Sequence, residues 1–240
     1  SAGDPRHAIR QELPALLPAG ANLYLGFSDL RADLDRLGAS GLWSSFEGGG
    51  NHEAFIRSRL WLRFKDRLIQ LEGLIGHPLD GPSLDEMAAS TCALAFYEVG
   101  DIEFVYVARE DLETRLLQAL GEMSGDFQTA RHGDVSYRTV RDELLGIELV
   151  WATSGGYLMV SDREHLLKET LDRIDGGGAS LANDPGFRKV VDALPPEGDQ
   201  VVYLNLARLR DDGYFRRYWL QKDRTLLEQH EAFGATAVWE

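Results

Sequence analysis

The sequence is short of cysteine, of long apolar runs and of basic residues. Its one cysteine, Cys92, cannot form a disulfide within the chain. No apolar run approaches the roughly 20 residues that a membrane-spanning helix needs. The 25 Lys and Arg residues are outnumbered by 39 Asp and Glu, which gives a formal net charge of −14. These shortages disfavour a disulfide-stabilised fold, a transmembrane segment in this chain and a nucleic-acid-binding protein, whose phosphate contacts need clustered Lys and Arg.

Motifs for phosphate binding and for nucleophilic catalysis are also missing from the sequence. The triple glycines at 48–50 and 176–178 are not followed by Lys-Ser or Lys-Thr, and they do not fit the spaced glycines of a dinucleotide fingerprint. No Gly-x-Ser-x-Gly pattern is present, which disfavours an α/β-hydrolase. We interpret both glycine runs as connectors.

The six histidines do not form a paired metal-binding motif. His165 and Glu169 are four residues apart and share a helix face, a spacing that is more typical of a surface pair than of a metal site. His132 and Asp134 flank a glycine in a predicted turn, where polar residues are ordinary. We therefore predict no catalytic residue, no metal and no cofactor, and favour a chain that is not an enzyme.

A β-hairpin organises the predicted fold. Residues 92–97 and 102–107 are rich in β-branched and aromatic residues on both sides of a turn that contains Gly100. Nearly every position is apolar, which predicts that both faces are covered and that the hairpin lies inside a sheet. Strands are also predicted at 23–27, 127–131, 136–141, 147–152, 157–160, 201–206 and 234–240. Hairpins and meanders between helices indicate an α+β fold with antiparallel sheets flanked by helices.

The longest helical pattern covers residues 52–75, where apolar residues recur every three or four positions. The glycine-rich stretch before it, residues 38–50, is interpreted as a loop. Asp162 is expected to cap the helix that follows the meander, and Asp184 precedes a proline at the start of another helix. Further helices are predicted at 4–17, 30–37, 83–88, 111–123 and 211–231.

The sequence contains a candidate internal duplication. The stretch from Leu17-Pro18 to the strand 24–27 resembles the stretch from Leu194-Pro195 to the strand 203–206. Residues 93–98 likewise resemble residues 235–240. We interpret residues 13–175 as a first α+β unit and residues 176–240 as a linker with a partial second unit, the two either separate or packed as one globular domain. Chance similarity of ordinary strands is the alternative.

Basic residues gather on one side of the predicted helix 52–75, although the chain as a whole is acidic. Such a side can dock an acidic protein surface or anionic lipid head groups. The alternative is a solvated face that pairs with carboxylates of the same chain. The candidate interaction surface comprises Arg57, Arg59, Arg63, Lys65 and Arg67.

The motifs that carry the repeat also support a resemblance. Leu-Pro followed by Tyr-Leu-x-φ-x-x-Leu (φ apolar), the strand 93–97, its return strand 103–109 and the segment 178–187 resemble an uncharacterised group of bacterial exported proteins. That group is classified only as a domain of unknown function. The resemblance implies a periplasmic or other extracytoplasmic location, with a signal or membrane anchor removed from this sequence, and the cytoplasm is the alternative. It supplies no catalytic residues.

Three functions are consistent with these observations. The first is a non-catalytic module that binds a ligand, a protein or a lipid surface at the bacterial cell envelope. The second is an envelope hydrolase whose site is assembled from residues distant in sequence, which a cleft with convergent carboxylates and histidines would support. The third is a structural or assembly module. The first is favoured because no coherent catalytic set is visible in the sequence.

Overall fold

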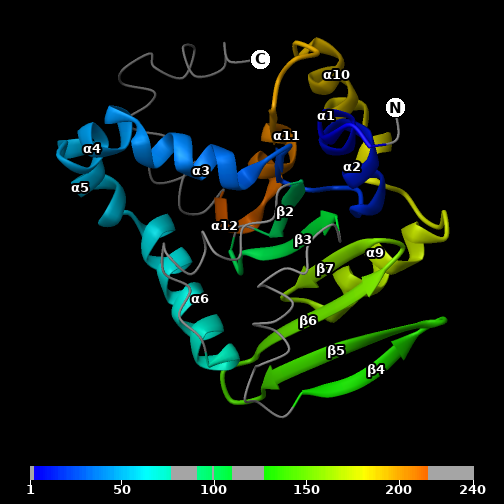
Figure 1. The fold of residues 1–240 in the computed structure, drawn as a ribbon. Helices are drawn as coiled ribbons and strands as arrows, with labels where there is room; N and C mark the ends of the chain where they lie inside the picture. The colour runs from blue at the N-terminus through cyan, green and yellow to red at the C-terminus, as the bar shows by residue number, and fades with distance from the viewer. Residues whose placement is uncertain (1–2, 77–90, 99, 110–126, 216–240) are drawn as a thin grey trace.

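A single antiparallel sheet runs through the molecule in the computed structural model, which describes residues 3–76, 91–98, 100–109 and 127–215 (Figure 1). Its strand order is β4-β5-β6-β7-β3-β2-β1-β8. Every neighbouring pair in the sheet is antiparallel. The strands are β1 (Leu23–Phe27), β2 (Cys92–Glu98), β3 (Glu103–Arg109), β4 (Gln128–His132), β5 (Val135–Asp142), β6 (Ile147–Ser154), β7 (Tyr157–Ser161) and β8 (Gln200–Leu204).

The predicted α+β class is confirmed, and so are the strands predicted within the described residues. The predicted hairpin is β2 and β3, and both strands have a neighbour on each side. This position inside the sheet explains why their sequences are apolar almost throughout. The four meander strands β4 to β7 form one half of the sheet. Each pairs antiparallel with the next strand in the chain, because short turns join them.

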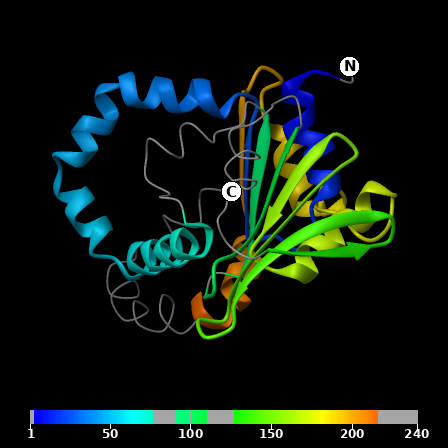
Figure 2. The ribbon, with the colours of Figure 1, turned by 60° about the horizontal axis from the view of Figure 1, so that its bottom comes forward.

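One face of the sheet is covered by a layer of helices that contains most of the core (Figure 2). An N-terminal helical segment runs from α1 (Pro5–His7) through a π-helical stretch (Ala8–Glu12) into α2 (Leu13–Leu16). Beside it lie α9 (Glu164–Ile174), a 3₁₀ turn (Leu181–Asn183) and α10 (Pro185–Ala193). Among the largest fully buried side chains on this side are Tyr24, Phe187, Ile9, Leu13, Leu17, Met159, Leu167 and Leu181.

The opposite face carries a helical arm, residues 30–75. It consists of α3 (Leu30–Ala39), α4 (Gly41–Glu47), α5 (Gly50–Ile56) and α6 (Arg59–Ile75). Figure 2 shows that the arm leaves the sheet along α3, turns at α4 and α5, and returns along α6. The returning end packs Leu71 into a second apolar cluster on the sheet, whose buried members also include Val140, Leu149, Trp151, Leu158 and Val160.

Two predictions for the arm are wrong. The stretch 38–50, predicted as a loop, is largely helical, since Gly48 and Gly49 have negative φ angles that helices and their flanks accept. The predicted helix 52–75 is divided between α5 and α6. Ser58 is the N-cap residue of α6, and its side chain accepts a hydrogen bond from the Trp61 N–H at 3.2 Å. The apolar spacing continues across this break, so periodicity alone does not reveal it.

The predicted cap at Asp162 is also wrong. Helix α9 begins at Glu164, and the side chain of its N-cap residue, Arg163, does not cap it. The Glu148 carboxylate instead accepts a hydrogen bond from the Glu164 N–H at 2.9 Å. The prediction for α10 is confirmed, because the Asp184 carboxylate accepts a hydrogen bond from the Phe187 N–H at 3.0 Å. After β8, Asn205 caps α11 (Leu206–Asp211), so the last predicted strand in the described part of the chain ends two residues early.

The two strands that suggested a duplication are neighbours in the sheet. Strands β1 and β8 pair antiparallel, so the predicted second unit contributes a strand beside the first. The duplication itself, and the unit boundaries at 13–175 and 176–240, stay predictions. Several predicted elements lie outside the described residues: the helices at 83–88 and 111–123, most of the helix at 211–231, and the strand at 234–240.

Candidate functional site

The helical arm is an insertion within a hairpin. Strands β1 and β2 pair antiparallel from Leu23 opposite Phe96 to Phe27 opposite Cys92, so residues 28–91 form the connection between two paired strands. Hairpin connections commonly need only about 2–5 residues. Long excursions of this kind are where binding surfaces are frequently found, because they extend a scaffold without altering its core.

The returning end of the arm is fixed to the sheet by a buried ion pair. Arg67 Nη2 donates to Asp162 Oδ2 at 2.6 Å, and the Phe104 N–H donates to Asp162 Oδ1 at 2.8 Å. The Arg67 side chain is 12% exposed and that of Asp162 is fully buried. Burial raises the pKa of the Asp162 carboxyl, while the Phe104 N–H and the Arg67 guanidinium act to lower it. Arg67 is therefore part of the arm's attachment.

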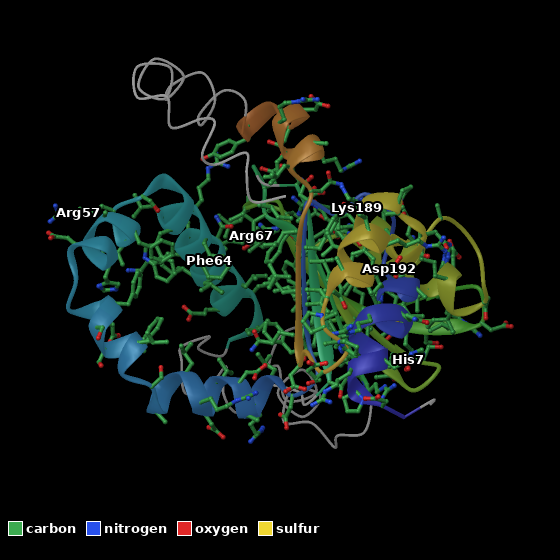
Figure 3. The ribbon with its side chains drawn as sticks, turned by 90° about the horizontal axis from the view of Figure 1, so that it is seen from above. His7, Arg57, Phe64, Arg67, Lys189 and Asp192 are labelled. Carbon is green, nitrogen blue, oxygen red and sulfur yellow. The ribbon has the colours of Figure 1, made fainter. Side chains whose placement is uncertain are left out.

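The other predicted basic residues are divided between the inside and the outside of the arm. Arg63 donates to the Gly100 carbonyl, and its guanidinium lies 4.3 Å from the centre of the Tyr214 ring. Arg57 is 75% exposed and pairs with Glu53 at 2.6 Å. Figure 3 shows Arg57 at the outer end of the arm, whereas Arg67 and Phe64 lie between α6 and the sheet.

Arg59 is the first residue of α6, and Lys65 is exposed on the same helix. Two of the five residues, Arg63 and Arg67, are thus engaged with the body of the molecule. Arg57, which pairs with Glu53, and Lys65 lie exposed on the outside. The candidate surface of five basic residues stays a prediction, and the structure gives its members different surroundings.

The outward face of α6 carries two aliphatic side chains together with Lys65 and Asp66, which are both exposed. Leu62, Lys65 and Ile69 follow each other at intervals of three and four residues, which places them on one side of the helix. Leu62 is 49% exposed and Ile69 53%, and Lys65 is exposed between them. Helical periodicity alone would assign these apolar residues to the core, but Leu62 and Ile69 face solvent because the sheet lies on the other side of the helix.

A row of aromatic rings joins the middle of the arm. Trp43 of α4 contacts Phe46, which contacts Phe55 of α5, with ring centres 5.8 and 6.1 Å apart. Phe55 contacts Trp61 of α6 at 5.1 Å, and Trp61 contacts Phe64 at 5.9 Å. The rings hold α4, α5 and α6 together without belonging to the buried clusters on the sheet. Side chains that remain substantially exposed along the arm include Leu37, Leu42, Trp43 and Phe55.

The arm also differs from the rest of the chain in charge. Residues 30–75 contain seven Lys and Arg and six Asp and Glu, a formal charge of +1. The remaining residues contain 18 Lys and Arg and 33 Asp and Glu, a formal charge of −15. The exposed apolar side chains of the arm therefore lie on a segment that is close to neutral.

A second candidate site lies at the far end of α9. His132 Nε2 lies 2.6 Å from Asp172 Oδ1, which joins the end of β4 to this helix. Beside the pair is a surface pocket of about 480 Å³, in which Arg173 is held by the Ala179 carbonyl oxygen. The pocket is lined by Glu169, Asp172, Arg173, Asp175, Gly177 and Gly178. Sequence reasoning missed the His132–Asp172 pair because its members are 40 residues apart.

A partly buried polar group ties the N-terminal helices to the sheet. Arg109 donates to both carboxylate oxygens of Glu12, at 2.5 and 3.1 Å, and Tyr157 donates its hydroxyl proton to the same carboxylate. The Arg109 hydrogen bond lowers the pKa of Glu12 against the effect of burial, with a further contribution from Tyr157. Burial and the Glu12 carboxylate raise the pKa of Tyr157 to about 12. We interpret this group as structural.

Within the described ranges, no group of His, Cys, Asp and Glu residues is arranged to hold a metal ion. None of the helices described has both the length and the apolar character needed to cross a membrane. Comparisons with family models, with curated proteins and with solved structures found no match for the chain.

Proposed function

We propose that the chain is a non-catalytic binding module of the cell envelope and that its helical arm is the binding surface. One observation carries this proposal: the described part of the connection between two hairpin-paired strands extends into four helices that expose large apolar side chains. The sheet needs no such connection to pair β1 with β2. The arm is therefore the part of the described structure that a role in stability explains least.

The exposed side chains support binding rather than solvation. Leu42, Trp43, Phe55, Leu62 and Ile69 are between 40% and 76% exposed and follow one another along the arm. Exposed apolar groups along one element commonly mark an interaction site, since covering them removes apolar surface from water. Aromatic residues and Arg are enriched at such sites, and the arm contains both.

The location in the envelope rests on the resemblance described above. Its residues Leu17 and Pro18 precede β1, and the strands that carry the rest of it are β2 and β3 at the centre of the sheet. Fractionation of cells of the source organism that produce the full-length gene product tests the location directly. Recovery in the cytosolic fraction would contradict it.

Site-specific photo-crosslinking tests the arm as the binding surface. A photoreactive phenylalanine analogue replaces Leu62 on the arm in one variant and Leu144 in the other. Leu144 is a suitable control because it is 98% exposed, apolar and located in the turn between β5 and β6. We expect adducts in living cells from position 62 and not from position 144. Equal adducts from both positions, or none from position 62, would overturn the proposal.

A hydrolase is the second candidate, and the His132–Asp172 pair beside the pocket favours it. Asp172 would orient the imidazole, and Glu169 supplies a second carboxylate on the pocket wall. Hydrolysis of a panel of chromogenic esters, phosphates and glycosides by the purified chain tests this candidate. Turnover that is lost in both His132→Ala and Asp172→Asn would establish it in place of the non-catalytic proposal.

A further inference from the structure

We infer that the outer edge of β8 accepts a further strand in the way that β1 accepts β2, and that residues 234–240 of this chain are that strand. These residues lie outside the part of the chain that the structure describes. The inference stands apart from the function proposed for the arm. It rests on the relation between β1 and β8, on the character of the outer edge of β8, and on the likeness of residues 235–240 to β2.

A local two-fold axis relates β1 and β8. The two strands pair antiparallel, and Tyr24 of β1 lies directly opposite Tyr203 of β8. These tyrosines are equivalent in the candidate duplication, because each stands first in the motif Tyr-Leu-x-φ-x-x-Leu. The axis therefore passes between them, normal to the sheet. It relates the edge of β1 that pairs with β2 to the outer edge of β8.

The surroundings of the two tyrosines agree with this axis. The Tyr24 hydroxyl donates to the Ile9 carbonyl oxygen at 2.6 Å, and the Tyr203 hydroxyl donates to Asp184 Oδ1 at 3.4 Å. Each tyrosine thus bonds to the helical segment that precedes its own strand. Both segments contribute to the core on the same face of the sheet. A two-fold axis normal to the sheet leaves the face unchanged, as a duplicated helix–strand unit requires.

The outward backbone groups of β8 belong to Val202 and Leu204. The Asn205 N–H donates to the Asn22 carbonyl oxygen at 2.8 Å. Hydrogen-bonded pairs recur at every second residue of an antiparallel ladder, so Tyr203 also bonds to β1 and the residues on either side of it direct their N–H and C=O groups outward. The side chains of Val202 and Leu204 are 59% and 49% exposed. A strand that pairs here gains hydrogen bonds and also covers apolar surface.

The outer edge of β8 lacks the features that keep strands from pairing. Free edges are commonly protected by charged side chains or by proline. Strand β4, at the other end of the sheet, contains Arg131 and His132, whereas β8 has the sequence Gln-Val-Val-Tyr-Leu without charge or proline. Among the described residues, no strand pairs with this edge of β8. Its composition is that of a strand with two neighbours.

The occupant is selected by its likeness to the strand that β1 accepts. Residues 235–240 share with β2 the pattern Ala-x-Ala-x-aromatic-Glu. The second alanine of this pattern in β2, Ala95, is fully buried opposite Tyr24. The same register pairs Ala237 with Tyr203, so that a small residue again lies beside the tyrosine.

This register also gives the exposed side chains of β8 suitable neighbours. It pairs Val238 with Val202 and Thr236 with Leu204. Cross-strand pairs that contain β-branched residues stabilise antiparallel strands. An antiparallel return needs as few as about two connecting residues, and residues 205–233 provide far more.

Paired cysteines in the full chain test the register. In a Cys92→Ala background, Val202→Cys/Val238→Cys places two thiols opposite each other at a separation that a disulfide can bridge. The matched control is Val202→Cys/Ala237→Cys, because successive residues of a strand point to opposite faces. We expect oxidation to form a disulfide within the chain in the first variant and at least about tenfold less of it in the control. Mass spectrometry of the intact and digested protein identifies the bond.

Hydrogen exchange tests the pairing without a crosslink. We expect the outward amides of Val202 and Leu204 to exchange as slowly in the parent as the amide of Tyr203, which bonds to β1. In Val238→Pro both should exchange at least about tenfold faster, because proline lacks an N–H and disrupts pairing. The control Val238→Ala keeps the N–H and should retain slow exchange.

The outcomes also separate this strand from other occupants of the edge. A disulfide that joins two chains would show that a second copy pairs with β8 and would overturn the choice of residues 234–240. Equal disulfide yields in the two cysteine variants, including none in either, would overturn the inference. Fast exchange of the Val202 and Leu204 amides in the parent would do the same. None of these results bears on the crosslinks expected from the arm, so the proposed function is tested separately.

Discussion

Tyr24 and Tyr203 lie directly opposite each other on the antiparallel strands β1 and β8, and both rings meet Phe187 edge to face. The ring centres are 5.2 Å apart for Tyr24 and Phe187 and 5.4 Å apart for Phe187 and Tyr203. The Tyr24 hydroxyl donates to the Ile9 carbonyl oxygen at 2.6 Å. Phe187 thus holds α10 against the edge of the sheet, and Tyr24 joins that edge to the N-terminal helices.

We expect Phe187→Ala to lower the free energy of unfolding by about 3–5 kcal/mol, because it leaves a cavity between two buried tyrosines. Phe187→Leu keeps most of the volume and should cost less than about 2 kcal/mol. Urea denaturation of the two variants and the parent measures both effects. Equal losses for Ala and Leu would show that volume at this position does not matter and would refute the packing argument.

Arg67→Ala should destabilise the protein far more than Arg57→Ala. The first change leaves the buried Asp162 without its closest cation, at a cost of about 3–5 kcal/mol. The second removes an exposed pair with Glu53 that contributes about 0.5 kcal/mol or less. Thermal or urea unfolding compares the two variants on one helical arm. Similar losses would contradict the assignment of Arg67 as an attachment residue.

Glu12 should make stability depend on acid. Arg109 is the main cause of the lowered pKa of Glu12 in the folded state. The ionised Glu12 therefore contributes fully to the free energy of unfolding above its ordinary pKa of 4.5, and this contribution is lost as the pH falls through the folded-state pKa. Glu12→Gln should cost about 1–2 kcal/mol at pH 7 and reduce the loss of stability between pH 4.5 and lower pH. Urea midpoints across this range measure it.

The exposed Glu47 on α4 provides the control, since Glu47→Gln should leave the acid dependence as it is in the parent. If Glu12→Gln retained the full loss of stability in acid, the carboxylate responsible would have to lie elsewhere.

Ser58→Ala should weaken the start of α6 by about 1 kcal/mol, because the Trp61 N–H loses its acceptor. The control is Ser44→Ala on α4, whose hydroxyl donates only to the Gly41 carbonyl oxygen and caps no helix. Native-state hydrogen exchange of the amides in α6 detects the local effect. Slower or unchanged exchange in Ser58→Ala would contradict the cap and with it the stated reason for the break between α5 and α6.

The strands were predictable because their patterns are local. Residues 23–27 alternate between one face and the other, and the meander strands are separated by turns at Gly133, Gly146 and Gly155, all of which have positive φ. Such turns favour glycine, which the sequence shows directly. The class of fold followed from these signals without any knowledge of which strands pair across the sheet.

The surroundings of the candidate site were not predictable in the same way. The partner of Arg67 is 95 residues away along the chain, and that of His132 is 40 residues away. The sequence analysis placed the basic residues on one side of this helix, whereas the structure directs Arg63 and Arg67 to the body of the molecule and leaves Lys65 on the outward side with Leu62 and Ile69. The predicted cap at Asp162 was wrong for the same reason, since this carboxylate binds Arg67 and the Phe104 N–H instead.

The strand order has a consequence for folding. Strands β4 to β7 pair with their neighbours along the chain, so this half of the sheet requires only short loops to close. Strand β1 pairs with β2 and with β8, both far away in sequence, and closing such loops costs more conformational entropy. We expect the meander to form first and β1 to join the sheet late. The half of the molecule that bears the arm would then be the last to acquire its native structure.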